Sequence, residues 1–174
     1  MGRAGENIKN RLYLGFNAFK HIKRIRYWRG HGVHSPYVYA IVREVFMCSK
    51  LKSEQRDLYD SLIALGASKR RARELQNLMG HCHYSTFGID CDIEQMEGYD
   101  MVITSLQCDN DTLQAMAGKA TELRTTLCIL APAHNSSRHS CCKALIQNHR
   151  CTSIDNRDYL LLFNNHLPKQ EFEL

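Results

Sequence analysis

Polar residues stand where three short apolar runs of this sequence end, and their types could support chemistry. Asp90 closes the first run, Thr104 and Ser105 close the second, and His134 follows the third, Thr126–Pro132. A carboxylate at the end of a buried strand can accept hydrogen bonds from both hydroxyls of a ribose, and a histidine can accept a proton near neutral pH. The alternative for Asp90 is an Asx turn or a helix cap, and a histidine in a loop is more often simply exposed.

Two strands with a helix between them are expected to position these residues. Tyr99–Ser105 and Thr126–Pro132 are apolar at nearly every position, and the segment between them has helical periodicity. Strands of this kind are typically buried on both faces, as in parallel sheets that helices cover. The sequence therefore predicts a Rossmann-like α/β fold, in which ligands bind outside the carboxyl ends of the strands. The expected site comprises Thr104–Leu106 and Ala131–Asn135.

The remaining elements follow from capping residues and from hydrophobic spacing. Ser35 with Pro36, Ser53, and Ser68 are typical first residues of helices. The expected helices are 36–48, 53–65, 68–79 and 136–149, the expected strand before Tyr99 is 84–90, and the expected C-terminal hairpin pairs 152–155 with 159–163.

The composition limits the classes of protein to which this chain can belong. The chain has 174 residues, of which 44% are hydrophobic, so it can bury a core without disulfides or a metal. No apolar run is long enough to cross a membrane, and a cytoplasmic location with reduced thiols is expected. His81-Cys82-His83 with Cys91 could suggest zinc, but the usual structural-zinc spacing is absent, and no metal is expected.

Charge separates the chain into two parts. Residues 1–52 carry a net charge of +9, and the remainder carries −4. The expected division is a basic helical extension, 1–52, and a reduced Rossmann-like domain, 53–174. Within the extension, Ile8–Trp28 has apolar residues every three or four positions and predicts an amphipathic helix. Its apolar face could dock on the domain or form a homo-oligomer. The basic arm could bind an anionic partner such as nucleic acid, or be only a solvated face.

The most distinctive block is Gly30-His31-Gly32-Val33-His34-Ser35-Pro36-Tyr37-Val38. Two histidines three residues apart could form an acid–base pair or bind a metal, although capping and packing roles are commoner. The block resembles the His-Gly-(Val/Ile)-His-Ser-Pro-Phe-Val signature of Bacteroidetes-type class I S-adenosylmethionine-dependent methyltransferases. The end of the chain, Pro168-Lys169-Gln170-Glu171-Phe172, is also similar to the Lys-Gln-His-Phe tail of that family.

The resemblance implies a transferase with a mostly parallel Rossmann-like sheet and an antiparallel C-terminal strand. It implies S-adenosylmethionine as cofactor, with an unknown methyl acceptor. For that cofactor, the strand-end residues Asp90, Thr104 and Ser105 are the candidate contacts, and the resemblance makes His134 the candidate catalytic base. Further candidate pocket residues are His31, His34 and Ser136.

The sequence departs from the family at the places that matter for the cofactor. Before the central strands, where the family has a glycine-rich loop, this sequence has only Gly66-Ala67-Ser68. The acidic residues that the family has at two strand ends are replaced here by Thr104-Ser105 and Ala131-Pro132. Two hypotheses follow. The first is an S-adenosylmethionine-dependent methyltransferase-like protein with a reduced pocket, in which catalysis could be retained or lost. The second is a non-catalytic binding or assembly module whose basic N-terminal helix could bind nucleic acid, a protein partner or a second copy of the chain.

Overall fold

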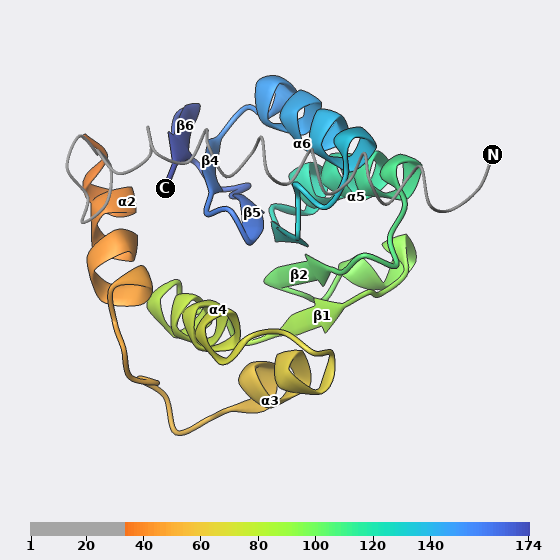
Figure 1. The fold of residues 1–174 in the computed structure, drawn as a ribbon. Coiled ribbons are helices and arrows are strands. Elements are labelled where there is room, and N and C mark those ends of the chain that lie inside the picture. The colour runs from red at the N-terminus through yellow and green to blue at the C-terminus, as the bar shows by residue number, and fades with distance from the viewer. Residues whose placement is uncertain (1–33) are drawn as a thin grey trace.

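The structure is a computed structural model that describes residues 34–174. The helix expected over Ile8–Trp28 and the candidate residue His31 lie outside these residues. Figure 1 shows the elements in chain order, which are α2 (Pro36–Ile41), the π-helix η2 (Val42–Phe46), α3 (Asp57–Ala64), α4 (Lys69–His81), β1 (Phe87–Ile89), the 3-10 helix η3 (Ile93–Met96), β2 (Met101–Thr104), α5 (Asn110–Leu123), β3 (Thr126–Leu130), α6 (Ser136–Asn148), β4 (Thr152–Asp155), β5 (Tyr159–Leu162) and β6 (Gln170–Glu173).

The strands form one mixed sheet in the order β1-β2-β3-β5-β4-β6. Strands β1, β2 and β3 are parallel, β5 is antiparallel to both β3 and β4, and β6 is parallel to β4. The α/β class and the hairpin of β4 with β5 are therefore confirmed. The antiparallel strand expected near the C-terminus is β5. It is followed by β6, which sequence patterning did not predict because this short, charged segment has no apolar run.

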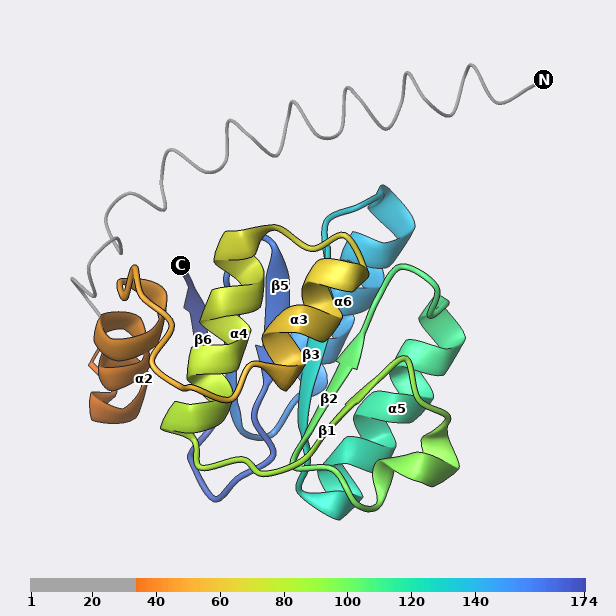
Figure 2. The same ribbon diagram turned by 90° about the horizontal axis from the view of Figure 1, so that it is seen from below.

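Helices cover both faces of the sheet (Figure 2). Met101 and Ile103 of β2 pack in one core with α2, η2, α3 and α4, whereas Val102 packs in a second core with η3, α5 and α6. Successive side chains of a strand point to opposite faces, so a strand covered on both faces must be apolar throughout. Burial on both faces therefore explains why the sequence of β2 is a continuous apolar run.

Local capping explains most helix starts. Ser35 and Ser68 accept hydrogen bonds from the backbone N–H of Val38 and Arg71 at 3.4 and 3.3 Å, as predicted. Ser53 was the wrong choice for α3, which begins at Asp57. The Ser53 hydroxyl instead accepts a hydrogen bond from the Gln55 N–H at 3.1 Å, which holds a turn ahead of the helix.

The expected division between residues 52 and 53 stays a prediction. Within the expected extension, Val38, Ile41 and Val45 are fully buried in the core that α3 and α4 share. Residues 36–46 therefore pack as part of the folded domain. None of the helices in the described part of the chain combines the length and the apolar character needed to cross a bilayer.

Asp100 joins β2 to the segment before β1. Its Oδ2 accepts hydrogen bonds from the N–H groups of Ser85 and Thr86 at 2.7 and 3.0 Å, and from the Thr86 hydroxyl at 3.1 Å. Slight burial raises the pKa of Asp100, but these hydrogen bonds outweigh it and lower the pKa below its ordinary value. The ionised carboxylate therefore stabilises the fold.

We expect Asp100→Asn to be less stable than the unchanged protein at pH 7. Because the folded-state pKa is lowered, this contribution is present above the unfolded pKa of about 3.9 and is lost as the pH falls through the folded value. Urea unfolding between pH 7 and pH 3 should show the two proteins converging on acidification. The exposed Glu97→Gln is the control, and a difference for Asp100→Asn that persisted at pH 3 would contradict the prediction.

Candidate functional site

The carboxyl ends of β1 and β2 are joined by one of the candidate residues. Asp90 has a positive φ of 47° and directly follows β1. Its Oδ1 accepts a hydrogen bond of 2.6 Å from the Ser105 N–H, and its own N–H donates to the Ile103 carbonyl at 2.9 Å. The structure thus brings Asp90 and Ser105 together, as their places at neighbouring strand ends suggest. One carboxylate oxygen holds the tip of β2, so this contact is a cross-strand link rather than an Asx turn.

Thr104 lies beneath this edge rather than on it. Its side chain is fully buried, and the alternation with Val102 places it on the face that α5 and α6 cover. The Thr104 Oγ1 has no hydrogen-bond partner among the described residues. A hydroxyl in this position does not reach a ligand in solvent, so Thr104 contributes to the interior of the tip.

Arg138 is the residue at this edge that sequence reasoning missed. It lies in the first turn of α6, after the N-cap Asn135, and is only 4% exposed. Its guanidinium donates to the carbonyls of Ser105 at 2.8 Å, Leu130 at 3.2 Å and Cys108 at 2.8 Å. The arginine thereby joins the ends of β2 and β3 to the loop before α5. No local pattern marks it, because its three acceptors come from other elements.

The other candidates at the end of β3 are exposed. His134 lies in the turn between β3 and α6, and its N–H donates to the Ala131 carbonyl at 3.1 Å. Ala131 has a positive φ of 48°, and its N–H donates to the Asp158 carbonyl at 2.8 Å. Ser136 is the exposed first residue of α6. A histidine here is accessible to a ligand, although none of these contacts orients its ring.

His34 is placed at the other end of the sheet. It is exposed and precedes α2, in which the ring of Tyr37 packs edge-on against Phe163 at a centroid distance of 5.7 Å. Phe163 follows β5, whose end pairs with the beginning of β3. The structure therefore does not bring His34 to the edge that holds Asp90 and His134.

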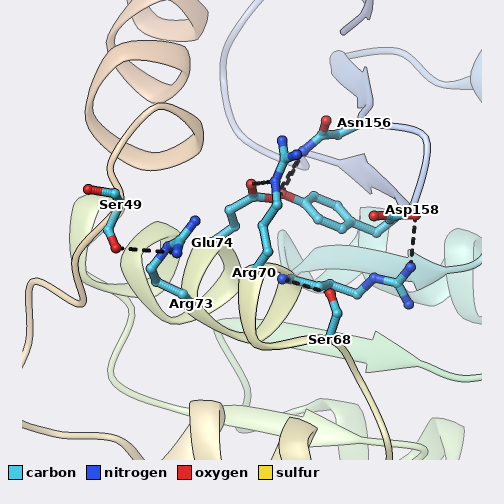
Figure 3. A network of polar contacts seen from close by, with 9 residues as sticks. Ser49, Ser68, Arg70, Arg73, Glu74, Asn156 and Asp158 are labelled. Atoms are coloured by element: carbon cyan, nitrogen blue, oxygen red, sulfur yellow. Dashed lines mark hydrogen bonds and ion pairs between the residues drawn. The ribbon is translucent and has the colours of Figure 1, made fainter. Parts of the chain in front are cut away.

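A buried polar network ties α4 to the β4–β5 turn at the carboxyl edge (Figure 3). Glu74 is 2% exposed; its Oε2 accepts from the Tyr159 hydroxyl at 2.9 Å and from Asn156 Nδ2 at 3.4 Å, and its Oε1 accepts from Arg70 Nε at 2.7 Å. In the same turn Asp158 pairs with Arg71 at 3.0 Å. Burial, followed by the nearby Glu74 carboxylate, raises the pKa of Tyr159 well above its ordinary value, so this hydroxyl stays protonated.

Glycines near the edge serve packing and a turn. A Cβ on Gly88 of β1 would lie 2.7 Å from the ring of Tyr99. Only glycine at this position therefore leaves room for the Tyr99 side chain. Gly66 has a φ of +82° in the turn between α3 and α4, a conformation that favours glycine. Neither glycine is part of a loop that follows a strand and opens onto a cofactor.

Burial holds three of the cysteine thiols in their protonated form. All eight are free thiols. Burial raises the pKa of Cys82 and Cys128, and it raises the pKa of Cys142 to about 12, so these three remain protonated. Among residues 34–174, no group of three or more His, Cys, Asp or Glu side chains could hold a metal ion.

Comparisons of the chain with protein-family models, with curated proteins and with solved structures gave no match. The resemblance to class I methyltransferases therefore stays a prediction from the sequence. The geometry by itself defines a carboxyl edge whose buried polar groups mostly bond to one another, with His134 exposed beside it.

Proposed function

We propose that this chain is a methyltransferase-like scaffold that does not transfer methyl groups and acts as a cytoplasmic binding module. In this proposal the Rossmann-like domain is a folded support, and the basic N-terminal segment binds an anionic partner. S-adenosylmethionine is not a working cofactor in this proposal.

The hydrogen bond between Asp90 and Ser105 carries the proposal. The carboxylate whose place at a strand end makes it the candidate contact for a cofactor ribose already accepts a 2.6 Å hydrogen bond from the neighbouring strand tip. Thr104, a second candidate for the cofactor, is fully buried. The internal hydrogen bond occupies one acceptor position of Asp90 Oδ1, so a ribose that bonds to both carboxylate oxygens would compete with the Ser105 N–H at Oδ1.

The charge distribution supports the binding role. Residues 1–52 carry +9 against −4 for the remainder, so the basic charge is concentrated at one end of the chain. A concentrated positive field attracts polyanions and speeds their association. The chemistry of such a partner is a dense array of phosphates or carboxylates.

One pair of titrations tests the proposal. Calorimetry with S-adenosylmethionine and S-adenosylhomocysteine should give no saturable heat up to about 1 mM ligand, a dissociation constant that corresponds to about −4.1 kcal/mol. A labelled DNA duplex, used as the polyanion probe, should bind with an affinity that falls by roughly 0.9 log units per log unit of salt for each phosphate contacted.

Two results would contradict the proposal. Saturable micromolar binding of S-adenosylmethionine that Asp90→Ala abolishes and Asp92→Ala retains would restore the enzyme hypothesis. Duplex binding that is absent at low salt, or insensitive to salt, would remove the polyanion as partner. Asp92 is the matched control because it is an exposed carboxylate on the same loop.

A further inference from the structure

Basic side chains are concentrated at the beginning of α4. Lys69, Arg70, Arg71 and Arg73 are four of its first five residues, and its first turn contains no acidic residue. The N-terminus of a helix carries a partial positive charge, so acidic residues are favourable there and basic residues are not. The charge at this end of α4 therefore does not serve the stability of the helix.

The β4–β5 turn brings a fifth basic residue next to this end of α4. Asp158 pairs with Arg71 at 3.0 Å. Asn156 Nδ2 lies 3.4 Å from Glu74 Oε2, so the residues on both sides of Arg157 contact α4 (Figure 3). Arg157 is exposed and has a φ of +52°, a left-handed conformation that is uncommon for residues other than glycine. The turn thus carries an arginine where glycine would be less strained.

The protein itself leaves much of this positive charge open to solvent. The side chains of Lys69 and Arg157 form no ion pair or hydrogen bond with any residue of the described part of the chain. Arg70 keeps 69% of its side chain exposed, and the Asp158 carboxylate that pairs with Arg71 is 61% exposed. Water and dissolved ions can therefore reach these groups.

Three carboxylates lie near these cations without cancelling them. Glu74 is 2% exposed, and both of its oxygens accept hydrogen bonds inside the protein. Asp155 Oδ1 accepts a hydrogen bond from the Arg157 N–H at 3.0 Å, but Asp155 follows Ile154 of the α4 core and so lies on the opposite face of the sheet. Asp158 is the exposed one. Five cations against three carboxylates leave +2 here, whereas residues 53–174 as a whole carry −4.

We propose that the surface formed by these five cations binds the phosphate backbone of a nucleic acid; we call it the α4 basic surface, and it consists of Lys69, Arg70, Arg71, Arg73 and Arg157. The planar guanidinium of arginine can donate two parallel hydrogen bonds to one phosphate, and the positive end of the helix adds to the attraction. The inference rests on the proposed function for the class of partner, a polyanion. It adds a contact surface on the folded domain to the one proposed for the N-terminal segment.

Binding of a labelled DNA duplex to the full chain at several salt concentrations tests the α4 basic surface. Lys69→Gln combined with Arg157→Gln removes two exposed cations. Each phosphate contact that is lost should make the plot of log affinity against log salt shallower by roughly 0.9, so the slope should fall by about 1.8. The affinity at low salt should fall at least about tenfold. Asp158→Asn removes the carboxylate that competes for Arg71 and should tighten binding.

Lys143→Gln combined with Arg150→Gln is the matched control. It removes the same charge from exposed positions in and just after α6, which covers the opposite face of the sheet. The salt slope of this variant should stay within about 0.5 of that of the unchanged protein. Urea unfolding should show that the Lys69→Gln, Arg157→Gln variant is at least as stable as the unchanged protein, because the Lys69 cation opposes the helix dipole. Weaker binding in that variant is then not a consequence of unfolding.

Three results would overturn the inference. Duplex binding with the same salt slope in both double variants would show that the contacts lie elsewhere, and the proposed function would stand without the α4 basic surface. Absence of duplex binding by the unchanged protein at low salt would remove both the inference and the polyanion of the proposed function. Tighter binding to vesicles that contain anionic lipids than to the duplex, weakened by the same substitutions, would assign the surface to a membrane instead.

Discussion

Replacing Arg138 by methionine should lower the free energy of unfolding by about 3–5 kcal/mol. The guanidinium is almost fully buried and is the donor to the carbonyls of Ser105, Leu130 and Cys108. A hydrogen bond to a charged group contributes about 1.5–3 kcal/mol, and a buried carbonyl left without a donor is costly. Methionine keeps much of the apolar stem but supplies no donor, so the ends of β2 and β3 lose their common tie. Urea unfolding at pH 7 measures the change.

Two further substitutions distinguish the contribution of the Arg138 hydrogen bonds from the contribution of its charge. Arg150→Met removes a charge from an exposed position just after α6 and should change stability by less than about 0.5 kcal/mol. Arg138→Lys keeps the charge but loses the planar fork that reaches several carbonyls at once, so it should recover only part of the loss. A loss below about 1 kcal/mol for Arg138→Met would show that the three carbonyls find other partners.

Replacing Glu74 by alanine should be the second large effect, with a loss of about 3 kcal/mol. The substitution leaves a cavity and removes the acceptor of the fully buried Tyr159 hydroxyl, which lies 2.9 Å from Glu74 Oε2. Asn156 Nδ2 donates to the Tyr159 oxygen at 2.8 Å, but it offers no acceptor, so the buried Tyr159 O–H is left without a partner. Thermal and urea unfolding should both show the change, because Glu74 connects α4 to the β4–β5 turn.

A double-mutant cycle distinguishes this network from simple packing. Tyr159→Phe alone should cost about 1.5–3 kcal/mol, because it removes a hydrogen bond to a buried carboxylate. The coupling energy between Glu74 and Tyr159 should reach at least about 1 kcal/mol. Arg70→Ala is the contrast: the Arg70 side chain is 69% exposed, so solvent screens its pair with Glu74 and the loss should stay below about 1 kcal/mol. Additive effects of the Glu74 and Tyr159 substitutions would refute the network.

Both sets of substitutions act on the same edge of the sheet. Arg138 holds the tips of β2 and β3, and Glu74 holds the turn between β4 and β5. The Ala131 N–H, which donates to the Asp158 carbonyl at 2.8 Å, connects the two regions. An edge tied in this way should resist local opening, because opening it would break several buried hydrogen bonds together.

The sequence alone predicted the elements whose signals are local. The apolar runs of β2 and β3, the helical periodicity between them, and the serine caps of α2 and α4 depend on neighbours within a few residues, and the structure confirms them. The hairpin of β4 and β5 was predictable for the same reason, since a short polar turn joins two apolar runs.

The sequence did not determine what the polar residues at the strand tips would contact. Asp90 was correctly placed at a strand end, but a 2.6 Å contact with Ser105 depends on the register of β1 against β2. Thr104 was expected to be available and is buried, because α5 and α6 close over that face. Arg138 was not singled out, since nothing in α6 distinguishes it from a solvated arginine.

Only the tertiary structure decided these contacts, and the reason is the distance along the chain. Glu74 and Tyr159 are 85 residues apart, and Arg138 and Ser105 are 33 apart, yet each pair forms a hydrogen bond of 2.8–2.9 Å. Periodicity and capping carry information over one or two turns of chain. Whether a carboxylate binds a ligand or a neighbouring strand depends on how whole elements pack, because packing determines which donors lie within 3 Å and which remain in water.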